Sequence, residues 1–451
     1  MINLYKRKLN LYLNMKKIFT SMMLLLAIAA GMSLVSCNKQ KDEKKYTAKE
    51  SANKIDATGE AFIQELDLNN WQATTDLVIP AILFMENDDI DMSGAPAPEI
   101  ETKEEKVDVA KLVWSRTYTI DMSRAKGHYT ISAEGKGSKA EGDFKDFQIA
   151  FTTEGHNYVA DFEFTNSDKT VLINYDEYEA GYYYDANDNY VSCPGMIRKS
   201  SSYLVLPAKL TGYFTVDDTK HFTVEGNLSY NGVADPRELT DLKAVTINAD
   251  LAVKAGDYAV NLSKLSLKGG TFDEAFTLRR NKKLLLELTS KATGLNVVDN
   301  PYPKSGEEEE IESVFPFACE NAQVALDVLG QVQVKGNIKF NELYSKFATI
   351  AGAEPKNAEE ANALLKQIEP YYNLNVYYDK GSVVQASVRA KAFENEEKEI
   401  DVTAVINFQD GTSQAVPEFF TAENFGKTYA ALENLVGKVQ EYIQSMVPAE
   451  E

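Results

Sequence analysis

Apolar and polar residues alternate with a period of two along most of the segment 107–340. In a β-strand this spacing places apolar side chains on one face and polar side chains on the other. Such strands belong to antiparallel sheets, because strands of a parallel sheet are covered on both faces and lack the alternation. The pattern therefore predicts antiparallel meanders. The clearest runs have their apolar residues at 147, 149 and 151, at 158, 160, 162 and 164, at 222, 224, 228 and 230, and at 245, 247, 249, 251 and 253.

Two turns are indicated within this region. Glu154 and Gly155 separate two alternating runs and predict the tip of a hairpin. From Val324 to Phe340 every even position is apolar or glycine. This run allows one strand of more than about 50 Å, with its glycines as kinks, or two strands joined by a turn at Gly330 and Gln331.

Helical spacing replaces the alternation on both sides of these strands. The segment 46–92 predicts two helices, and Pro80 should kink or split the second one. The segment 341–369 is also helical, and Asn357 and Glu360 have the spacing of a capping box within it.

The C-terminal segment has the most regular helical spacing in the chain. Thr421 is the predicted cap of this helix and Pro448 its end. Its polar face mixes both signs of charge, unlike a cationic membrane-surface helix, so we expect it to pack on the protein's own sheet and not on a partner or a membrane. Its apolar stripe consists of Phe425, Tyr429, Leu432, Val436, Val439, Ile443 and Met446.

Together these patterns predict an α+β protein, mainly antiparallel β, in which elongated one-sided meander sheets are covered by amphipathic N- and C-terminal helices. Two acidic segments without periodicity, 93–106 and 299–312, are predicted to be exposed loops. They separate a helical segment, 46–92, from a β-meander, 107–298, and from a final segment, 313–451, of strands and helices.

The first 36 residues have the layout of a secretory signal peptide. Met15-Lys16-Lys17 is a short basic region, and an apolar run from Ile18 to Ala30 follows it. The next residues, Leu34-Val35-Ser36-Cys37, resemble the lipobox of bacterial lipoproteins. The resemblance implies that Cys37 is diacylated and becomes the mature N-terminus, whereas the alternative is a membrane helix with an incidental cysteine. Because the signal is complete from Met15 onward, we expect translation to start at Met15.

Residues 37–45 form a charged tether with nothing apolar to bury. Within the tether, Lys41, Asp42 and Glu43 resemble the signal that follows the lipid cysteine in surface-exported lipoproteins of Bacteroidetes. This resemblance implies an outer-membrane protein that is held by a lipid anchor and faces the cell surface. The alternative is the periplasmic face of the same membrane.

The negative charge of the chain argues against polyanionic partners. Net charge is −21, and removal of the first 36 residues, which hold five basic residues and no acid, brings it to −26. Such an acidic protein is not expected to bind nucleic acid or anionic lipid headgroups. The remaining 415 residues exceed one ordinary core and predict two or three domains or one elongated scaffold.

Two cysteines remain once Cys37 is assigned to lipid. In an oxidising envelope Cys193 and Cys319 could form a disulfide. It would close a loop of roughly 125 residues and contribute a few kcal/mol of stability. The alternative is a pair of buried thiols.

A tyrosine-rich segment is the main candidate for a binding surface. The segment contains Tyr178, Tyr182, Tyr183 and Tyr184, together with Tyr175 and Tyr190, among acidic residues. An aromatic platform with a polar rim suits a protein or glycan ligand. Tyrosine is also favoured in strands, so an ordinary edge strand explains the same residues.

No other motif predicts a catalytic or metal site. Asp185, Asn187 and Asn189 have the spacing of the first ligands of an EF-hand calcium loop. The sixth position of that loop needs glycine and the twelfth an acid, but they are Tyr190 and Met196 here. A hairpin tip is therefore expected. The three histidines, at 128, 156 and 221, lack metal-ligand spacing and are expected to be solvated.

The sequence therefore favours a non-catalytic, surface-exposed binding or structural module without a cofactor. A second hypothesis is a carrier or chaperone that holds a hydrophobic ligand under a curled sheet. A third is a hydrolase, which would need a cleft with two carboxylates about 5 to 10 Å apart.

Overall fold

The computed structural model describes residues 45–67, 69, 72–85, 90–93, 95, 98–185, 187, 189–297, 317–351, 355–394 and 400–445. These residues divide into two compact units. The first unit contains the described residues of segments 1–68, 283–292 and 319–451, and the second contains those of 69–282 and 293–318. Each unit consists mainly of antiparallel strands with a few helices, which confirms the predicted fold class.

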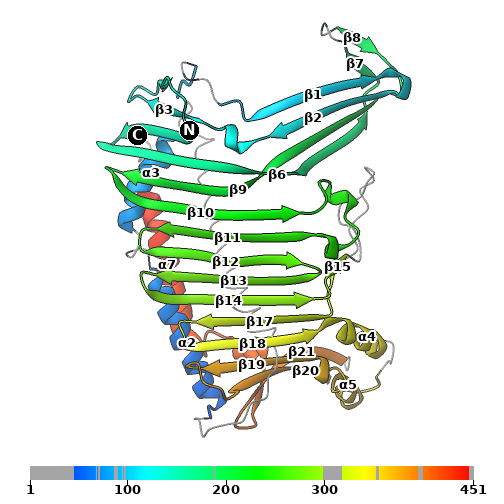
Figure 1. Cartoon of the computed structure of the whole chain (residues 1–451). Helices are drawn as coiled ribbons and strands as arrows, with labels where there is room; N and C mark the ends of the chain where they lie inside the picture. Colours follow the sequence, from blue (N-terminus) through cyan, green and yellow to red (C-terminus); the bar gives the residue numbers. More distant parts are fainter. Residues whose placement is uncertain are drawn as a thin grey trace. The chain divides into compact units, whose positions relative to one another are not determined.

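Two very long strands organise the second unit. β6 (His156–Glu179) and β9 (Ile197–Val216) pair antiparallel over nearly their whole length, with three register shifts that let them bend. Along its C-terminal half, β9 also pairs with the first strand of a regular meander (Figure 1). The meander consists of β10 (Thr219–Asn231), β11 (Thr246–Ala255), β12 (Tyr258–Lys268) and β13 (Thr271–Arg280).

The N-terminal half of β9 has a different neighbour. There it pairs in parallel with β2 (Val113–Ile120), which pairs antiparallel with β1 (Glu101–Asp108). The β6–β9 ribbon therefore continues into β10 at one end and into β2 at the other.

The predicted hairpin at Glu154 and Gly155 is confirmed. It joins β5 (Phe147–Thr153) to β6, and both turn residues have positive φ angles, of 48° and 81°. Two positive φ values define the tight turn that matches the twist of a hairpin, and glycine adopts the second one without strain. Two short strands, β3 (Gly127–Ile131) and β4 (Gly137–Lys139), extend this part of the sheet.

A helix covers the hairpin. α3 (Gln72–Met85) places Ala81 and Phe84 against Phe151 of β5, and the rings of Phe84 and Phe151 stack 4.8 Å apart. Tyr158 of β6 belongs to the same buried cluster. The helix runs through Pro80 without being split, so a split at this proline is excluded.

The structure corrects the prediction that 93–106 is a loop. Glu101 to Asp108 form strand β1, whose backbone pairs with β2 over its whole length. The sequence shows no alternation here because most side chains of this edge strand are in water on both faces. Charged side chains on an edge strand also discourage pairing with other chains.

Two pairings depart from the predicted antiparallel pattern. β2 pairs in parallel with β9, and β3 pairs in parallel with β5. A parallel pair needs a long connection, and residues 121–196 supply it between β2 and β9. Alternation within one strand says nothing about the direction of a partner so far along the chain.

The first unit contains a second meander, in which each strand pairs antiparallel with the next. Its order in the chain is the order in the sheet. Two further strands of the structure, β15 (Asn296–Val297) and β16 (Phe317–Ala318), pair within the second unit. The strands of the first unit's meander are β17 (Asn321–Val328), β18 (Val332–Lys339), β19 (Tyr372–Tyr378), β20 (Ala386–Glu394), β21 (Ile400–Phe408) and β22 (Ser413–Ala415), and β14 (Lys283–Thr293) lies almost wholly in the same unit.

The run from Val324 to Phe340 forms two strands, so the alternative of one long strand is wrong. β17 and β18 meet at a turn in which Leu329 and Gly330 have φ angles of 55° and 69°. The turn lies one residue before the predicted position.

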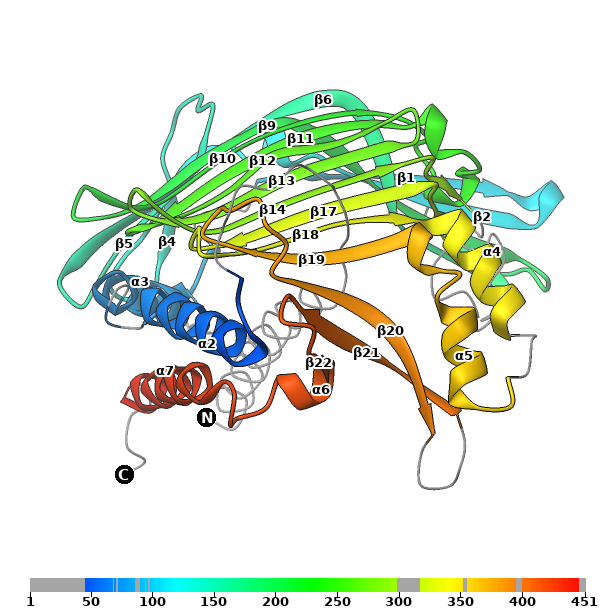
Figure 2. The ribbon, with the colours of Figure 1, turned by 90° about the horizontal axis from the view of Figure 1, so that it is seen from below.

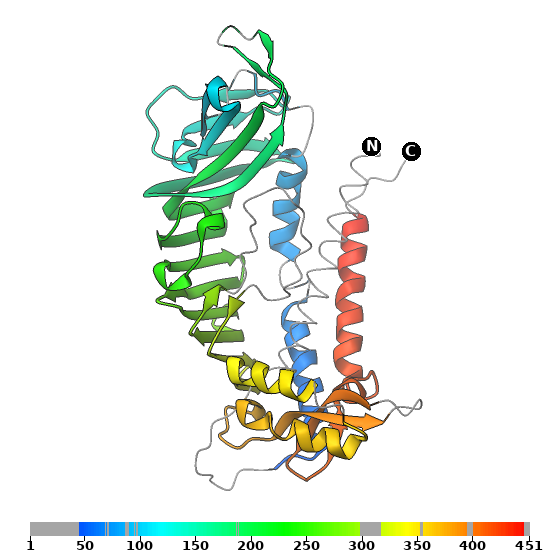
Figure 3. The ribbon, with the colours of Figure 1, turned by 90° about the vertical axis from the view of Figure 1, so that its right-hand side faces the viewer.

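Two helices pack beside this meander. α4 (Phe340–Ala351) follows β18 directly, and α5 (Ala358–Leu365) packs on β20 (Figure 3). Asn357 caps α5 as predicted, because its side chain accepts a hydrogen bond from the N–H of Glu360 at 2.9 Å. Asn362 fixes the helix to β20 through two hydrogen bonds with the backbone of Ala392, of 2.8 and 2.9 Å.

The first and last helices of the described chain pack on each other (Figure 2). α2 (Ala48–Glu65) begins with a capping box formed by Thr47 and Glu50, and α7 (Gly426–Ser445) follows the short helix α6 (Val416–Phe419). The buried carboxylate of Asp56 in α2 accepts a hydrogen bond of 2.8 Å from the N–H of Thr428. Asp56 therefore caps the N-terminus of α7 from another helix.

Gly59 allows this close approach. A Cβ atom at position 59 would lie 2.5 Å from Oγ1 of Thr428, closer than real Cβ contacts. At the other end of the pair, Nζ of Lys438 lies 2.6 Å from a carboxylate oxygen of Asp67.

The predicted stripe of α7 is partly wrong. Tyr429 and Val436 are exposed, whereas Leu435 is buried. The helix turns its buried face toward α2, so the expected packing on the sheet is replaced by a helix–helix contact. The helix also begins at Gly426, and not directly after Thr421.

Candidate functional site

The register of three strands brings an arginine between two aromatic residues. Arg198 on β9 lies opposite Trp114 on β2 and opposite Tyr178 on β6. Directly opposite residues of neighbouring strands share one face of a sheet. Residues from three distant parts of the sequence therefore meet at this end of the β6–β9 ribbon.

Arg198 contacts both rings. Its guanidinium carbon lies 4.4 Å from the ring centre of Trp114 and 5.7 Å from that of Tyr178. It also donates a hydrogen bond of 2.9 Å to the hydroxyl of Tyr178. The indole of Trp114 is buried, and each such cation–π contact contributes about 0.5 to 1 kcal/mol. Trp114 thus forms the floor of the site and fixes the orientation of Arg198.

A second arginine contacts the same indole but is neutralised. Arg116 lies 5.0 Å from the ring centre of Trp114, and its guanidinium lies 2.5 Å from a carboxylate oxygen of Glu105 on β1. Burial is the largest influence on Glu105 and acts to raise its pKa, but the hydrogen bonds and charges of Arg116 and Lys103 together outweigh it and the pKa is lowered. Arg198 differs, because no carboxylate among the described residues lies within ion-pair distance of it.

A short hairpin adds three tyrosines. β7 (Tyr182–Tyr184) and β8 (Tyr190–Ser192) pair antiparallel. The rings of Tyr182 and Tyr190 stack 5.0 Å apart, and Tyr184 meets each of them edge to face, at 5.8 and 6.3 Å. Tyr184 also lies 6.2 Å from Trp114, so the hairpin continues the arginine-containing site.

We call this set of residues the Tyr–Arg platform: Trp114, Tyr178, Tyr182, Tyr184, Tyr190 and Arg198. Three of its tyrosines, Tyr178, Tyr184 and Tyr190, are exposed, and Tyr190 has 61% of its surface in water. Three exposed rings and one arginine give the platform a large apolar area with polar groups at its edge.

Tyr183 does not belong to the platform. Successive side chains of a strand point to opposite faces, so Tyr183 lies on the other side of the hairpin from Tyr182 and Tyr184. Of the four predicted platform residues, the structure brings together Tyr178, Tyr182 and Tyr184.

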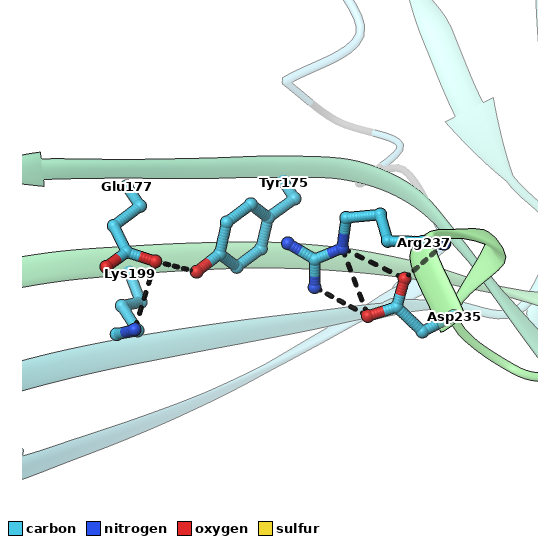
Figure 4. Close-up of polar contacts among 5 residues, drawn as sticks. All are labelled: Tyr175, Glu177, Lys199, Asp235 and Arg237. Atoms are coloured by element: carbon cyan, nitrogen blue, oxygen red, sulfur yellow. Dashed lines mark hydrogen bonds and ion pairs between the residues drawn. The ribbon is translucent and has the colours of Figure 1, made fainter. Parts of the chain in front are cut away.

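The opposite face of the β6–β9 ribbon carries a polar network (Figure 4). Tyr175 donates a hydrogen bond to Glu177, which also accepts one of 3.0 Å from Nζ of Lys199. Arg237, from the connection between β10 and β11, stacks on the ring of Tyr175 at 3.5 Å and binds both carboxylate oxygens of Asp235. Each charged group here has a partner of opposite charge.

The pKa values agree with a closed network. The hydrogen bond from Tyr175 and the neighbouring Lys199 lower the pKa of Glu177. Hydrogen bonding to Asp235 raises the pKa of Arg237. Burial and the carboxylate of Glu177 raise the pKa of Tyr175. All three keep their usual charge at neutral pH, so the charges of this network are paired with one another and the network supports the platform strands.

The turn between β7 and β8 is the expected hairpin tip. One carboxylate oxygen of Asp185 accepts hydrogen bonds from the backbone of Asn187 and Asn189, at 2.8 and 3.0 Å. Asp185 thus closes the turn and is not free to bind a cation. Across the described part of the chain, no group of three or more His, Cys, Asp or Glu side chains could hold a metal ion.

The histidines are not all solvated. His156 is exposed and contacts Asp217, with 2.6 Å between Nδ1 and the carboxylate. His128 instead stacks on Phe144 at 3.9 Å and lies 3.0 Å from Asp146, half-buried, so the prediction is wrong for this residue. His128 lies on β3 and not in a turn.

Cys193 and Cys319 are free thiols in this structure, and both are half-buried. Burial raises the pKa of Cys319. Their pairing stays a prediction. Cys37, the tether residues Lys41, Asp42 and Glu43, and the loop 299–312 lie outside the described residues.

Sequence reasoning missed Trp114 and Arg198 as members of the platform, whereas Tyr190 belongs to the tyrosine-rich segment that it identified. Trp114 and Arg198 are 84 positions apart in the chain and meet through the parallel pairing of β2 with β9. The one available signal was Trp114 itself, since tryptophan occurs twice in the whole chain.

No protein-family model matches this chain, and neither does any curated protein or solved structure. Among the described helices, none combines the length and the apolar character needed to cross a membrane.

Proposed function

We propose that this chain is a lipid-anchored, non-catalytic binding module of the bacterial outer membrane that faces the cell surface. Cys37 would carry the lipid, and Lys41, Asp42 and Glu43 would direct the protein outward. The Tyr–Arg platform would be the surface that contacts the partner.

One observation carries the proposal: Arg198 is held between two aromatic rings, beside exposed tyrosines, without a carboxylate partner among the described residues. Tyr, Trp and Arg are the residues that dominate the binding energy of protein interfaces. Their low side-chain freedom here also favours binding, since the rings and the guanidinium already contact one another.

The chemistry of Arg198 indicates the partner. A guanidinium has five N–H donors, and the hydroxyl of Tyr178 accepts from only one of its nitrogens. The remaining donors suit a carboxylate or backbone carbonyl groups. The expected partner is therefore a protein segment with an acidic or carbonyl-rich surface beside an apolar one.

Photo-crosslinking on intact cells tests the platform. A benzoylphenylalanine at position 190 should crosslink to a defined protein, whereas the same group at Leu251, exposed on β11, should not. Arg198→Ala should lower the yield at position 190 by about tenfold or more, as expected for a hot-spot residue. Lys209→Ala, an exposed cation on the same strand, is the matched control. Equal yields at 190 and 251, or no loss in Arg198→Ala, would contradict the proposal.

The anchor needs a separate test. Metabolic labelling with an alkyne fatty acid should mark the wild-type protein and a version that starts at Met15, but not Cys37→Ser. Replacing Lys41, Asp42 and Glu43 by alanine should protect the protein from protease added to whole cells. Unchanged protease sensitivity would show that these three residues are not the outward signal.

A further inference from the structure

The second unit contains a groove that shares no residue with the Tyr–Arg platform. It lies over one face of β6, β9, β10, β11 and β12, and residues 143–146 form one of its walls. Its volume is about 950 Å³, at the upper end of the range for small-molecule sites.

The strand register arranges the floor of the groove in rows. One row runs across four strands through Asp161, Tyr213, Thr223 and Lys254. The next row on the same face contains Glu163, Thr211 and Glu225. Carboxylates, hydroxyls and an ammonium group therefore alternate at the spacing of neighbouring strands, about 4.7 to 4.9 Å.

A pair of carboxyl groups lies at one end of the floor. Asp161 is only 8% exposed, and one of its oxygens accepts hydrogen bonds of 3.1 Å from Gln148 and from the hydroxyl of Tyr213. Asp146, from the wall, lies within hydrogen-bonding reach of Asp161, and its other neighbour is His128 at 3.0 Å.

The two carboxyl groups differ in their ionisation. Burial raises the pKa of Asp161, and the neighbouring Asp146 adds to this effect. For Asp146, burial is the largest influence and acts to raise the pKa, but the hydrogen bonds that the carboxylate accepts and the charge of His128 together outweigh it and the pKa is lowered. Asp161 therefore holds a proton more readily than Asp146 does.

We infer that this groove binds a small polyhydroxylated ligand of the sugar class. Each hydroxyl group of such a ligand is both a donor and an acceptor, so it can donate to a carboxylate and accept from a lysine or a tyrosine hydroxyl on the next strand. A neutral ligand also adds no net charge to a groove in which Lys145, Lys220 and Lys254 stand beside the acids.

Other ligand classes fit the groove less well. Most of its lining side chains are charged or carry hydroxyl or amide groups, which disfavours a lipid. Three lysines disfavour a simple cation. The Asp146–Asp161 pair is within hydrogen-bonding distance, closer than the separation of about 5 to 10 Å used in glycoside hydrolysis, so the site suits binding and not cleavage.

Saturation-transfer NMR on the full-length protein tests the inference. The protein would be purified in lauryldimethylamine oxide, because a glycoside detergent would occupy a sugar site. The probes are maltotriose, cellotriose and N,N′,N″-triacetylchitotriose, with arginine and decanoate as probes of the cation and lipid classes. We expect transfer to at least one of the sugars and to neither of the other probes.

Two variants and a control locate the binding. Lys254→Met changes an exposed side chain and should weaken sugar binding about tenfold, the cost of one hydrogen bond to a charged group. Asp161→Asn should weaken it by a similar factor. Asp273→Asn, in the Lys264–Asp273 ion pair outside the groove, should leave binding unchanged.

Each contrary result overturns the inference. Absence of transfer to all three sugars would show that the groove is not a sugar site. Transfer to arginine or decanoate alone would assign another ligand class. Sugar binding that is unchanged in Lys254→Met would place it outside the groove. None of these outcomes affects the crosslinking at position 190.

Discussion

β19 in the first unit and β11 in the second are both central strands of antiparallel meanders, but their side chains have very different surroundings. In β19 all residues from Leu374 to Tyr378 are buried, on both faces of the strand. In β11 no residue is buried, and Leu251 is 37% exposed. The same antiparallel backbone pairing thus occurs in a strand with buried side chains in the first unit and in a strand with water-exposed side chains in the second.

This difference separates two sources of stability. A strand such as β19 is stabilised by burial of apolar area, at about 25 cal/mol per Å². A strand such as β11 depends on its backbone hydrogen bonds and on contacts between neighbouring side chains, which contribute about 0.2 to 1 kcal/mol for each pair. Local stability should therefore be unequal between the units.

The largest expected effect is in β19. Leu374→Ala removes a side chain that is 2% exposed and should lower the free energy of unfolding of the first unit by about 2 to 5 kcal/mol, because a cavity remains. Hydrogen exchange followed by mass spectrometry should show faster exchange in peptides of β18 to β20. Peptides of β11 and β12 should exchange as in the wild type.

The matched change is Leu251→Ala in β11. We expect a loss of about 0.5 kcal/mol or less, because this side chain is already partly in water. If both leucine variants changed exchange equally, burial would not be what distinguishes the two strands.

The next effect concerns a buried polar contact in the first unit. Asp56→Ala removes the acceptor for the N–H groups of Lys427 and Thr428 and should cost about 1 to 3 kcal/mol. Circular dichroism during urea unfolding would measure the loss. Asp67→Ala breaks the partly exposed ion pair with Lys438 and should cost about 1 kcal/mol. An equal cost for the two variants would mean that the capping contact has no special role.

The smallest expected effect is a pH dependence in the second unit. The pKa of Asp161 is raised in the folded protein, so its contribution to stability is full at low pH and is lost as pH rises through the folded pKa. The lowered pKa of Asp146 gives the opposite dependence, since stability is lost as pH falls through it. The Asp146–Asp161 pair therefore stabilises the fold most at a pH between the folded-state pKa values of the two carboxyl groups.

Asp161→Asn should remove the loss of stability at the upper edge of this window. Hydrogen exchange of β5 and β6 peptides, corrected for the intrinsic effect of pH, would measure it. A wild-type protein with the same pH profile as this variant would show that the two carboxyl groups do not share a proton.

Local patterns predicted those parts of the fold that depend on neighbouring residues. The β5–β6 hairpin followed from alternation and from Glu154-Gly155. The β17–β18 turn was one of two alternatives for its segment, and it lies within one residue of the position proposed for it. β1 was missed because an edge strand in water needs no alternation. Alternation also identifies which side chains share a face without showing whether that face is covered, which is why β11 and β19 could not be distinguished.

The platform was predictable only in part for a related reason. Tyr178, Tyr182 and Tyr184 are close in sequence, and period two would have separated Tyr183 from the other two hairpin residues. Trp114 and Arg198 come from strands that meet in parallel, and no local pattern specifies that pairing. The groove was not predicted, since its rows exist only once four strands, β6, β9, β10 and β11, are in register.

Asp56 and Thr428 are 372 positions apart in the chain. Because a protein is synthesised from its N-terminus, α2 is made long before its partner helix α7 exists. Until then the Asp56 carboxylate stays hydrated and Gly59 has nothing to pack against. Contacts between such distant residues form late, because closing a long loop costs entropy. Folding of the first unit therefore finishes only when nearly the whole chain is available, and a chain that ends before α7 would leave its N-terminal helix open to proteases.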